Sequence, residues 1–179
     1  MAVYLSKQGK ELLGKRIEKA LAELDAIRAE KEIAYTASGD TWHDNPGFNA
    51  LEQAEHRKAV EVRDLQTVFT TGEIKPTEPR PIEAVGIGSI VRFLQIVEET
   101  GEEETGVYEI VGFGESDPAS RKIAYDSPIG AVLFGQKIGE CLEDGVFVPA
   151  KKSLCYFEVT GLFSSWDEAN AAERAQQGG

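Results

Sequence analysis

A long proline-free run, with apolar residues in alternating steps of four and three, restricts the first part of this chain to a coiled-coil helix. The run follows Ser6, is rich in Leu, Ala, Glu, Lys and Arg, and meets no proline before Pro46. Its apolar positions are Leu13, Ile17, Ala20, Leu24 and Ile27. This spacing aligns the apolar side chains along one narrow seam. We expect a helix from a Ser6 cap to residue 34 or 35, about 28 residues and roughly 40 Å long.

A second helix of similar length is expected after a short polar turn. Residues 37–47 contain the Gly, Asn and Pro that mark a turn. Pro46 suits the first position of a helix, and Asp44 or Asn45 can cap it. The stripe beyond consists of Leu51, Lys58, Val62, Leu65 and Phe69, with Ala54 and Ala59 as small neighbours. Two such helices pack antiparallel, since each buries a stripe that it cannot bury alone. The sequence therefore predicts a helical hairpin over residues 1–75 with its tip near 38–47.

The remainder of the chain predicts a β-rich domain. Three prolines in residues 76–81 predict a linker. Short runs rich in Val, Ile, Tyr and Phe then predict strands, the acidic stretch 98–104 predicts a solvated hairpin loop, and Ser127 can cap one short helix. The predicted strands are 89–97, 105–111, 122–126 and 154–159, and the helix is 127–135. Residues 164–179 have little to bury, so we expect a flexible tail. The fold class is α+β, with an antiparallel coiled-coil hairpin followed by a β-rich domain over 82–163.

The charge of the chain argues against nucleic acid phosphates as its main partner. Thirty-one acidic residues against nineteen basic ones give a net charge of -12, which phosphates repel. A protein partner with a basic surface fits better. No run of about eighteen apolar residues occurs, and residues 1–10 lack a signal-peptide core, so we expect a cytoplasmic protein without membrane contact. Cys141 and Cys155 form neither a disulfide framework nor a zinc-binding spacing.

The predicted tip carries two carboxylates, Asp40 and Asp44. Aspartates are common in turns for local hydrogen-bonding reasons, so both residues also fit a structural role. Their position favours a functional role, because a coiled coil of about 40 Å delivers its end far from its base. Carboxylates there suit hard cations such as magnesium, which one or two protein carboxylates often hold.

Two other side chains at the tip have open interpretations. Trp42 is either a stacking surface or a ring that folds back on Tyr35 or Phe48. His43 can ligate a metal or carry a proton, although one histidine is a weak signal. No Gly-rich phosphate loop, nucleophile elbow or Ser-His-Asp set occurs. We therefore expect no complete active site in this chain.

Three motifs together point to a known family. The first is Tyr-Leu-Ser at residues 4–6 followed by Gly9, and the second is Gly-Asp through Asp-Asn at residues 39–45. The third and most specific is Asp-Ser-Pro-Ile-Gly-Ala at residues 126–131. With these motifs the chain resembles the GreA/GreB family of bacterial transcription elongation factors over residues 4–163.

The resemblance implies how the hairpin acts. In that family the hairpin enters the secondary channel of bacterial RNA polymerase at a backtracked transcript. Asp40 and Asp44 match the tip acids, which help hold the second magnesium of the polymerase and its water, so that the polymerase cuts its own RNA. The chain would be a monomeric accessory factor and not an enzyme, with no cofactor of its own. It would act on the 3′ end of the nascent RNA only indirectly.

The resemblance also assigns binding residues. It implies an FKBP-like domain over residues 82–163 that docks on the rim of the channel, with Asp126, Ser127 and Pro128 in the loop that contacts polymerase. Trp42, His43 and Asn45 would be further contacts at the tip.

One departure from the family pattern leaves an alternative open. The family reads G-D-x-x-E-N, whereas here three residues separate Asp40 from Asp44, and the second acid is Asp. The alternative is a Gre-like regulator that binds the channel and inhibits polymerase without stimulating cleavage. A third interpretation is prolyl isomerisation by the FKBP-like domain, which needs an aromatic-lined pocket. The candidate rings, which also fit an ordinary core, are Phe93, Tyr108, Phe113, Tyr125 and Phe157.

Overall fold

The chain divides into two compact units, which are described separately. The computed structural model describes residues 2–140 and 145–177, and the side chains of residues 40, 41, 43, 176 and 177 lie outside that description, as does Cys141. The first unit comprises Met1–Val3 and Lys10–Gly72, and the second comprises Tyr4–Gly9 and Glu73–Gly179. The division expected at residues 75 and 76 therefore lies slightly earlier, and the second unit also includes a short N-terminal segment.

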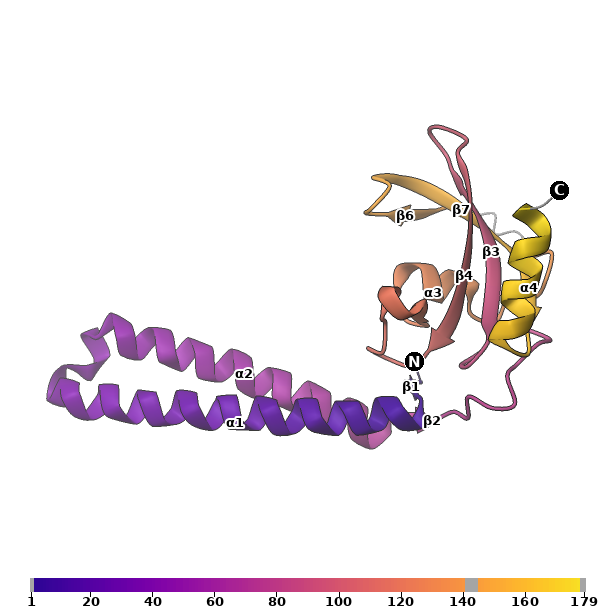
Figure 1. The fold of residues 1–179 in the computed structure, drawn as a ribbon. Coiled ribbons are helices and arrows are strands. Elements are labelled where there is room, and N and C mark those ends of the chain that lie inside the picture. The colour runs from indigo at the N-terminus through magenta and orange to yellow at the C-terminus, as the bar shows by residue number, and fades with distance from the viewer. Residues whose placement is uncertain (1, 141–144, 178–179) are drawn as a thin grey trace. The chain divides into compact units, whose positions relative to one another are not determined.

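The first unit is the predicted helical hairpin (Figure 1). It contains helix α1 (Lys7–Ser38), the 3₁₀ helix η1 (Gly39–Asp44) and helix α2 (Pro46–Thr71). α1 has 32 residues and ends at Ser38, beyond its predicted end at residue 34 or 35, because part of the expected turn is itself helical. The buried apolar side chains come from both predicted stripes and from the start of α2. They are Leu13, Ala20, Leu24, Phe48, Val62 and Leu65.

Contacts between α1 and α2 confirm their antiparallel arrangement, since the positions rise along one helix as they fall along the other. The contacts are a cation–π pair of Lys10 with Phe69, ion pairs of Glu23 with Lys58 and of Arg28 with Glu55, and a ring contact of Tyr35 with Phe48. Polar pairs thus flank the apolar seam along the length of the hairpin.

The second unit contains a five-stranded sheet in the order β5-β4-β3-β7-β6. Its strands are β3 (Ile90–Val97), β4 (Glu103–Val111), β5 (Lys122–Ala124), β6 (Val146–Val148) and β7 (Ser153–Phe163). All neighbours pair antiparallel except β4 and β5, which are parallel. A separate parallel pair joins β1 (Tyr4–Leu5) to β2 (Glu73–Ile74). A short 3₁₀ helix, η2 (Pro118–Ser120), precedes β5.

Helices cover both faces of this sheet (Figure 1). On one face, Phe93, Ile110 and Phe157 form the main core with Leu133 of α3 (Pro128–Leu133). On the other face, Ala169 of helix α4 (Trp166–Gln177) packs in a smaller cluster with Ile90, Val107 and Phe163. The α+β prediction is confirmed.

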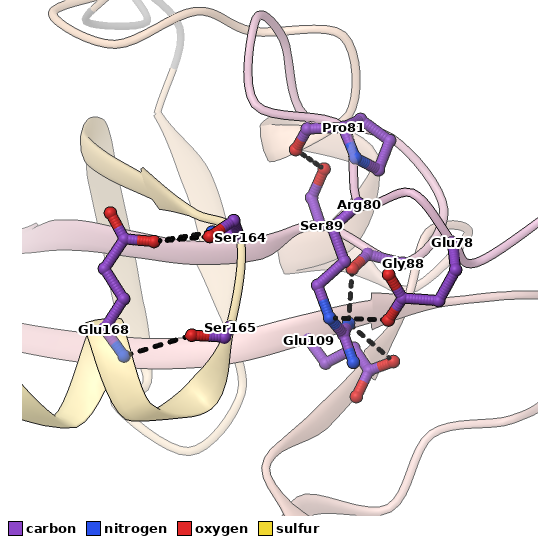
Figure 2. A network of polar contacts seen from close by, with 9 residues as sticks. All are labelled: Glu78, Arg80, Pro81, Gly88, Ser89, Glu109, Ser164, Ser165 and Glu168. Carbon is purple, nitrogen blue, oxygen red and sulfur yellow. Dashed lines mark hydrogen bonds and ion pairs between the residues drawn. The ribbon is translucent and has the colours of Figure 1, made fainter.

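The prediction of a flexible tail over residues 164–179 is wrong for α4. Ala169 has no exposed surface, so this helix has a contact that its polar composition conceals. Ser165 caps the helix by accepting a hydrogen bond from the Glu168 N–H at 3.2 Å. Glu168 accepts hydrogen bonds from the Ser164 side chain and backbone, which hold its pKa below the ordinary value (Figure 2). The Ser-x-x-Glu spacing is a known start signal for helices.

The segment predicted as a linker, residues 76–81, is bound to the sheet through Arg80. The Arg80 guanidinium donates to the Gly88 carbonyl at 2.6 Å and pairs with Glu109 of β4 at 3.2 Å (Figure 2). Buried Ser89 donates to the Pro81 carbonyl at 2.9 Å. This segment therefore belongs structurally to the second unit.

Within the described residues, no helix combines the length and apolar character needed to cross a bilayer.

Candidate functional site: the hairpin tip and the Asp-Ser-Pro loop

The tip is built by the way α1 ends and α2 begins. Gly39 adopts a φ of +53°, a left-handed conformation that glycine accommodates without strain and that commonly ends a helix. η1 continues to Asp44, and α2 then starts with Pro46 in its first turn. The residues between the two helices are therefore ordered in a tight helical turn.

Asn45 links the two helices with its side-chain amide. Its Oδ1 accepts from the Gly47 N–H at 2.8 Å and caps α2, as the sequence predicted. Its Nδ2 donates to Ser38 Oγ at 2.5 Å, and Ser38 Oγ donates to the Ala34 carbonyl at 2.7 Å. One side chain thus joins the last residue of α1 to the first turn of α2.

Trp42 folds back on both of the rings named as alternatives. Its ring centroid lies 5.0 Å from that of Phe48 in an edge-on arrangement and 5.7 Å from that of Tyr35. Phe48 is 6% exposed, so the cluster has a buried centre. Tyr35 is 50% exposed, and one side of the cluster therefore faces solvent.

Asp44 presents an exposed carboxylate at this tip. The side chains of Asp40 and His43 lie outside the described residues, so only their backbone positions in η1 are placed. Among the side chains that the structure describes, no three acidic, His or Cys residues come close enough to hold a metal ion. An exposed carboxylate of this kind can supply an oxygen ligand to a hard cation.

Just below the tip, Glu55 of α2 pairs with two cations of α1. It accepts from Lys31, and the Arg28 Nε–H donates to it at 2.9 Å. The hydrogen bond from Lys31, followed by that from Arg28, holds the pKa of Glu55 below its ordinary value. This ionic cluster links α1 to α2 just below the tip.

The Asp-Ser-Pro loop precedes α3 in the second unit. Ser127 Oγ accepts from the Gly130 N–H at 3.1 Å and caps α3, while Pro128 occupies the first helical turn, as predicted. Asp126 and Pro128 are exposed and Ser127 is half-buried. The loop thus displays one carboxylate and one rigid apolar ring on an ordered backbone.

Gly130 makes this loop possible because its backbone approaches β5 closely. A Cβ atom at this position would lie 2.0 Å from the Ala124 carbonyl oxygen, which leaves no room for a side chain. The Ser127 N–H donates to the same carbonyl at 3.0 Å. The glycine of the motif is therefore a packing requirement of the loop.

A cavity of about 450 Å³ lies beside the loop, with Ser127, Pro128, Phe93, Tyr108, Ile129 and Val148 among its lining residues. Two of the five rings named for a prolyl isomerase, Phe93 and Tyr108, thus line it. Phe157 is instead buried in the core, and Tyr125 contacts Tyr4. Isomerase activity stays a prediction, which a peptide isomerisation assay on the full chain tests.

Two residues with structural roles were not identified from the sequence. Ser38 joins the bridge at the tip, and Glu115 binds Ser6, which lies 109 positions away, at the start of α1. Ser38 precedes a glycine near a helix end, where a hydroxyl often bonds the preceding turn. The partner of Ser6 could not be found from spacing.

Taken together, the fold and the two candidate sites define a two-unit protein with exposed acids at both sites. One unit is a helical arm that ends in an exposed acid, and the other is an α+β unit with an ordered Asp-Ser-Pro loop. Exposed side chains on such an ordered backbone suit contacts with a partner macromolecule.

Comparison with known proteins identifies the family. The family model described as "Transcription elongation factor, GreA/GreB, C-term" matches residues 80–152. Transcription elongation factor GreA of Caldanaerobacter subterraneus subsp. tengcongensis is 31% identical over 140 residues, which cover 76% of this chain and 85% of the relative. GreA of Thermosipho melanesiensis is 28% identical over 160 residues, 89% of this chain and 96% of the relative. The GreA factor homolog 1 (Gfh1) structure of Thermus thermophilus aligns with a TM-score of 0.41 and 24% identity, covering 91% of this chain and 99% of that one. The chain belongs to the GreA/GreB family of transcription elongation factors.

Proposed function

We propose that this protein stimulates the cleavage of backtracked RNA by bacterial RNA polymerase, with its hairpin tip inserted in the secondary channel. The observation that carries the proposal is the exposed carboxylate of Asp44 at the end of a two-helix arm. α1 has 32 residues, which corresponds to about 48 Å at 1.5 Å per residue. Such an arm can reach a reactive centre that a compact domain of similar mass cannot enter.

The chemistry at the tip is that of a borrowed ligand. Asp44, together with Asp40, would add carboxylate oxygens to a magnesium ion that polymerase also holds, and magnesium accepts one or two carboxylates while keeping several waters. When bound, the ion lowers the pKa of an attacking water. The role of this chain is to hold carboxylates at a fixed place, so it acts as an accessory factor and not as an enzyme.

The second unit would provide affinity through the Asp-Ser-Pro loop. Asp126 and Pro128 are exposed on a backbone that Ser127 and Gly130 hold in place. An exposed carboxylate and the acidic surface of the chain suit a basic partner surface, where complementary charge steers association. This division assigns binding to one unit and chemistry to the other.

A cleavage assay with purified components tests the role of the tip. Asp40→Asn combined with Asp44→Asn is expected to abolish RNA release from backtracked complexes while polymerase binding, measured by competition, survives. Asp64→Asn, which neutralises an exposed acid of α2 far from the tip, is the matched control and should cleave like wild type. Normal cleavage by the double variant would refute the mechanism. Slower elongation with no cleavage products on adding wild type would instead establish the inhibitory alternative.

A second experiment separates docking from chemistry. Asp126→Ala and Pro128→Ala should raise the concentration of factor needed for half-maximal cleavage, while the rate at saturation stays unchanged. Glu99→Ala, at an exposed position of the hairpin loop between β3 and β4, is the control. If the loop variants lowered only the saturated rate, docking through this loop would be wrong.

A further inference from the structure

We propose that Trp42 is a positioning residue for Asp44, and that its ring fixes the backbone from which this carboxylate projects. The expected effect on RNA cleavage rests on the proposed function. Its structural part concerns the free protein and can be tested without polymerase.

Asp44 lies between two anchored residues. On its N-terminal side, the Trp42 ring packs against Phe48 of α2 and Tyr35 of α1, with centroid distances of 5.0 and 5.7 Å. On its C-terminal side, Asn45 caps α2 and bonds Ser38 of α1. The backbone is closed between them, since the Asn45 N–H donates to the Trp42 carbonyl at 3.2 Å. Asp44 therefore sits on a short arc that is held at both ends while its own side chain is exposed.

The aromatic anchor is itself firmly held. The Phe48 ring is 6% exposed, and Lys31 Nζ lies 6.0 Å from its centroid. Lys31 also pairs with Glu55, so the ring cluster joins the ionic cluster below the tip. The Trp42 ring contacts the buried Phe48 of α2 and Tyr35 of α1. Contact with both helices restrains the turn more than contact with one helix would.

The length of the turn explains why a restraint is needed. Three residues separate Asp40 from Asp44, so the second acid sits on a longer segment than a two-residue spacing gives. A longer flexible segment has more conformations, and only a fraction of them present the carboxylate in the orientation that a metal ion requires. Packing of the Trp42 ring reduces the number of conformations, because it excludes those in which the turn moves away from α1 and α2. If the packing is lost, the apparent affinity for the ion falls in proportion to the fraction of molecules that remain competent.

The test compares Trp42→Ala with the conservative Trp42→Phe. In the free protein, Trp42→Ala should accelerate hydrogen exchange of the amides of residues 42–45 by about tenfold, whereas Trp42→Phe keeps most of the protection. In the cleavage assay at saturating factor, Trp42→Ala should raise the magnesium concentration for half-maximal cleavage by about tenfold, and Trp42→Phe should restore most of the wild-type value. Ile33→Ala, which removes an apolar side chain that is 70% exposed on α1, should change neither measurement.

The outcomes separate this inference from the proposed function. If wild type stimulates cleavage and Trp42→Ala shows wild-type exchange and wild-type magnesium dependence, the positioning role is wrong. If Trp42→Ala loses cleavage and Trp42→Phe does not restore it, the indole acts otherwise than by packing, and the inference also fails. If wild type itself stimulates no cleavage, the proposed function fails, while the exchange experiment still decides whether Trp42 orders the turn.

Discussion

Glu115 binds Ser6 with both of its carboxylate oxygens. Its Oε1 accepts from the Ser6 N–H at 3.0 Å, and its Oε2 accepts from Ser6 Oγ at 2.5 Å. Ser6 Oγ in turn accepts from the Gly9 N–H at 2.8 Å and caps α1, as the sequence predicted. A Cβ atom at Gly9 or Gly112 would lie about 2 Å from the Glu115 carboxylate, so both glycines leave room for it. The loop after β4 therefore holds the start of α1 in the second unit.

Removing either partner of this contact should destabilise the protein. Ser6→Ala should cost about 1–2 kcal/mol because the cap is lost, and Glu115→Ala about 1–3 kcal/mol because buried donors lose their acceptor. The double variant should lose less than the sum, since the residues act together. Urea unfolding followed by circular dichroism measures these values, with Glu99→Ala as an exposed control. Strict additivity of the two changes would show that the contact contributes nothing.

Two glycines with opposite surroundings give opposite predictions. Gly130→Ala places a Cβ atom 2.0 Å from a backbone carbonyl and should destabilise the second unit by about 3 kcal/mol. Gly14→Ala lies within α1, where the nearest atom is a Phe69 ring carbon at 3.7 Å, and should stabilise the protein by about 0.5–1 kcal/mol. Thermal and urea unfolding compare the pair. Equal effects at the two sites would contradict the close approach at Gly130.

The ion pairs of Glu55 should make hairpin stability depend on pH. The folded-state pKa of Glu55 lies below its ordinary value of 4.5, mainly because of the hydrogen bond from Lys31 and next that from Arg28. The stabilisation is therefore present above pH 4.5 and is lost as the pH falls through the lowered pKa. Glu55→Gln should lower the melting temperature at pH 7 and remove part of its decline on acidification. Glu52→Gln is the exposed control, and an unchanged acid limb in Glu55→Gln would refute the assignment.

α4 should contribute to the stability of the sheet. Ala169→Asp places a charge where no surface is exposed, against Ile90, Val107 and Phe163, and should cost about 3 kcal/mol. Ala171→Asp changes an exposed position of the same helix and should have little effect. Denaturant unfolding of both variants makes the comparison. If Ala169→Asp unfolded like wild type, the tail would be only loosely attached.

The hairpin was predictable because its signals are local. Apolar spacing, proline position and the Asn45 cap each act within a few residues, and together they determined both helices and their pairing. The 3₁₀ helix over Gly39–Asp44 was not predicted, because Gly, Asn and Pro in a short segment indicate a turn without specifying its backbone geometry.

The second unit was only partly predictable, since its ends depend on distant partners. β7 continues to Phe163, beyond its predicted end, because a bulge opposite Arg92 and Phe93 allows pairing past Gly161. β6 spans three residues and was missed. α4 was missed because its buried contacts come from strands far away in sequence, although Ser165 and Glu168 carry a capping signal.

At the candidate site, the sequence predicted which residues are present at the tip and in the loop, but not which side chains contact one another. Asp44 is exposed at the tip, and the loop around Ser127 caps α3 as expected. The Trp42 ring contacts both Tyr35 and Phe48. The sequence could not show this, because contact with either ring was compatible with it.

The parallel pairing of β1 with β2 places Tyr4 opposite Glu73, so the chain leaves for the arm and returns from it through adjoining strands of one module. The hairpin is thus inserted in the sequence between two segments of the second unit, which pair with each other. Its helices can lengthen or shorten by matched turns without any change in this strand pair. Conversely, a fragment that starts after the arm would lack one strand of the pair and the residue that Glu115 binds.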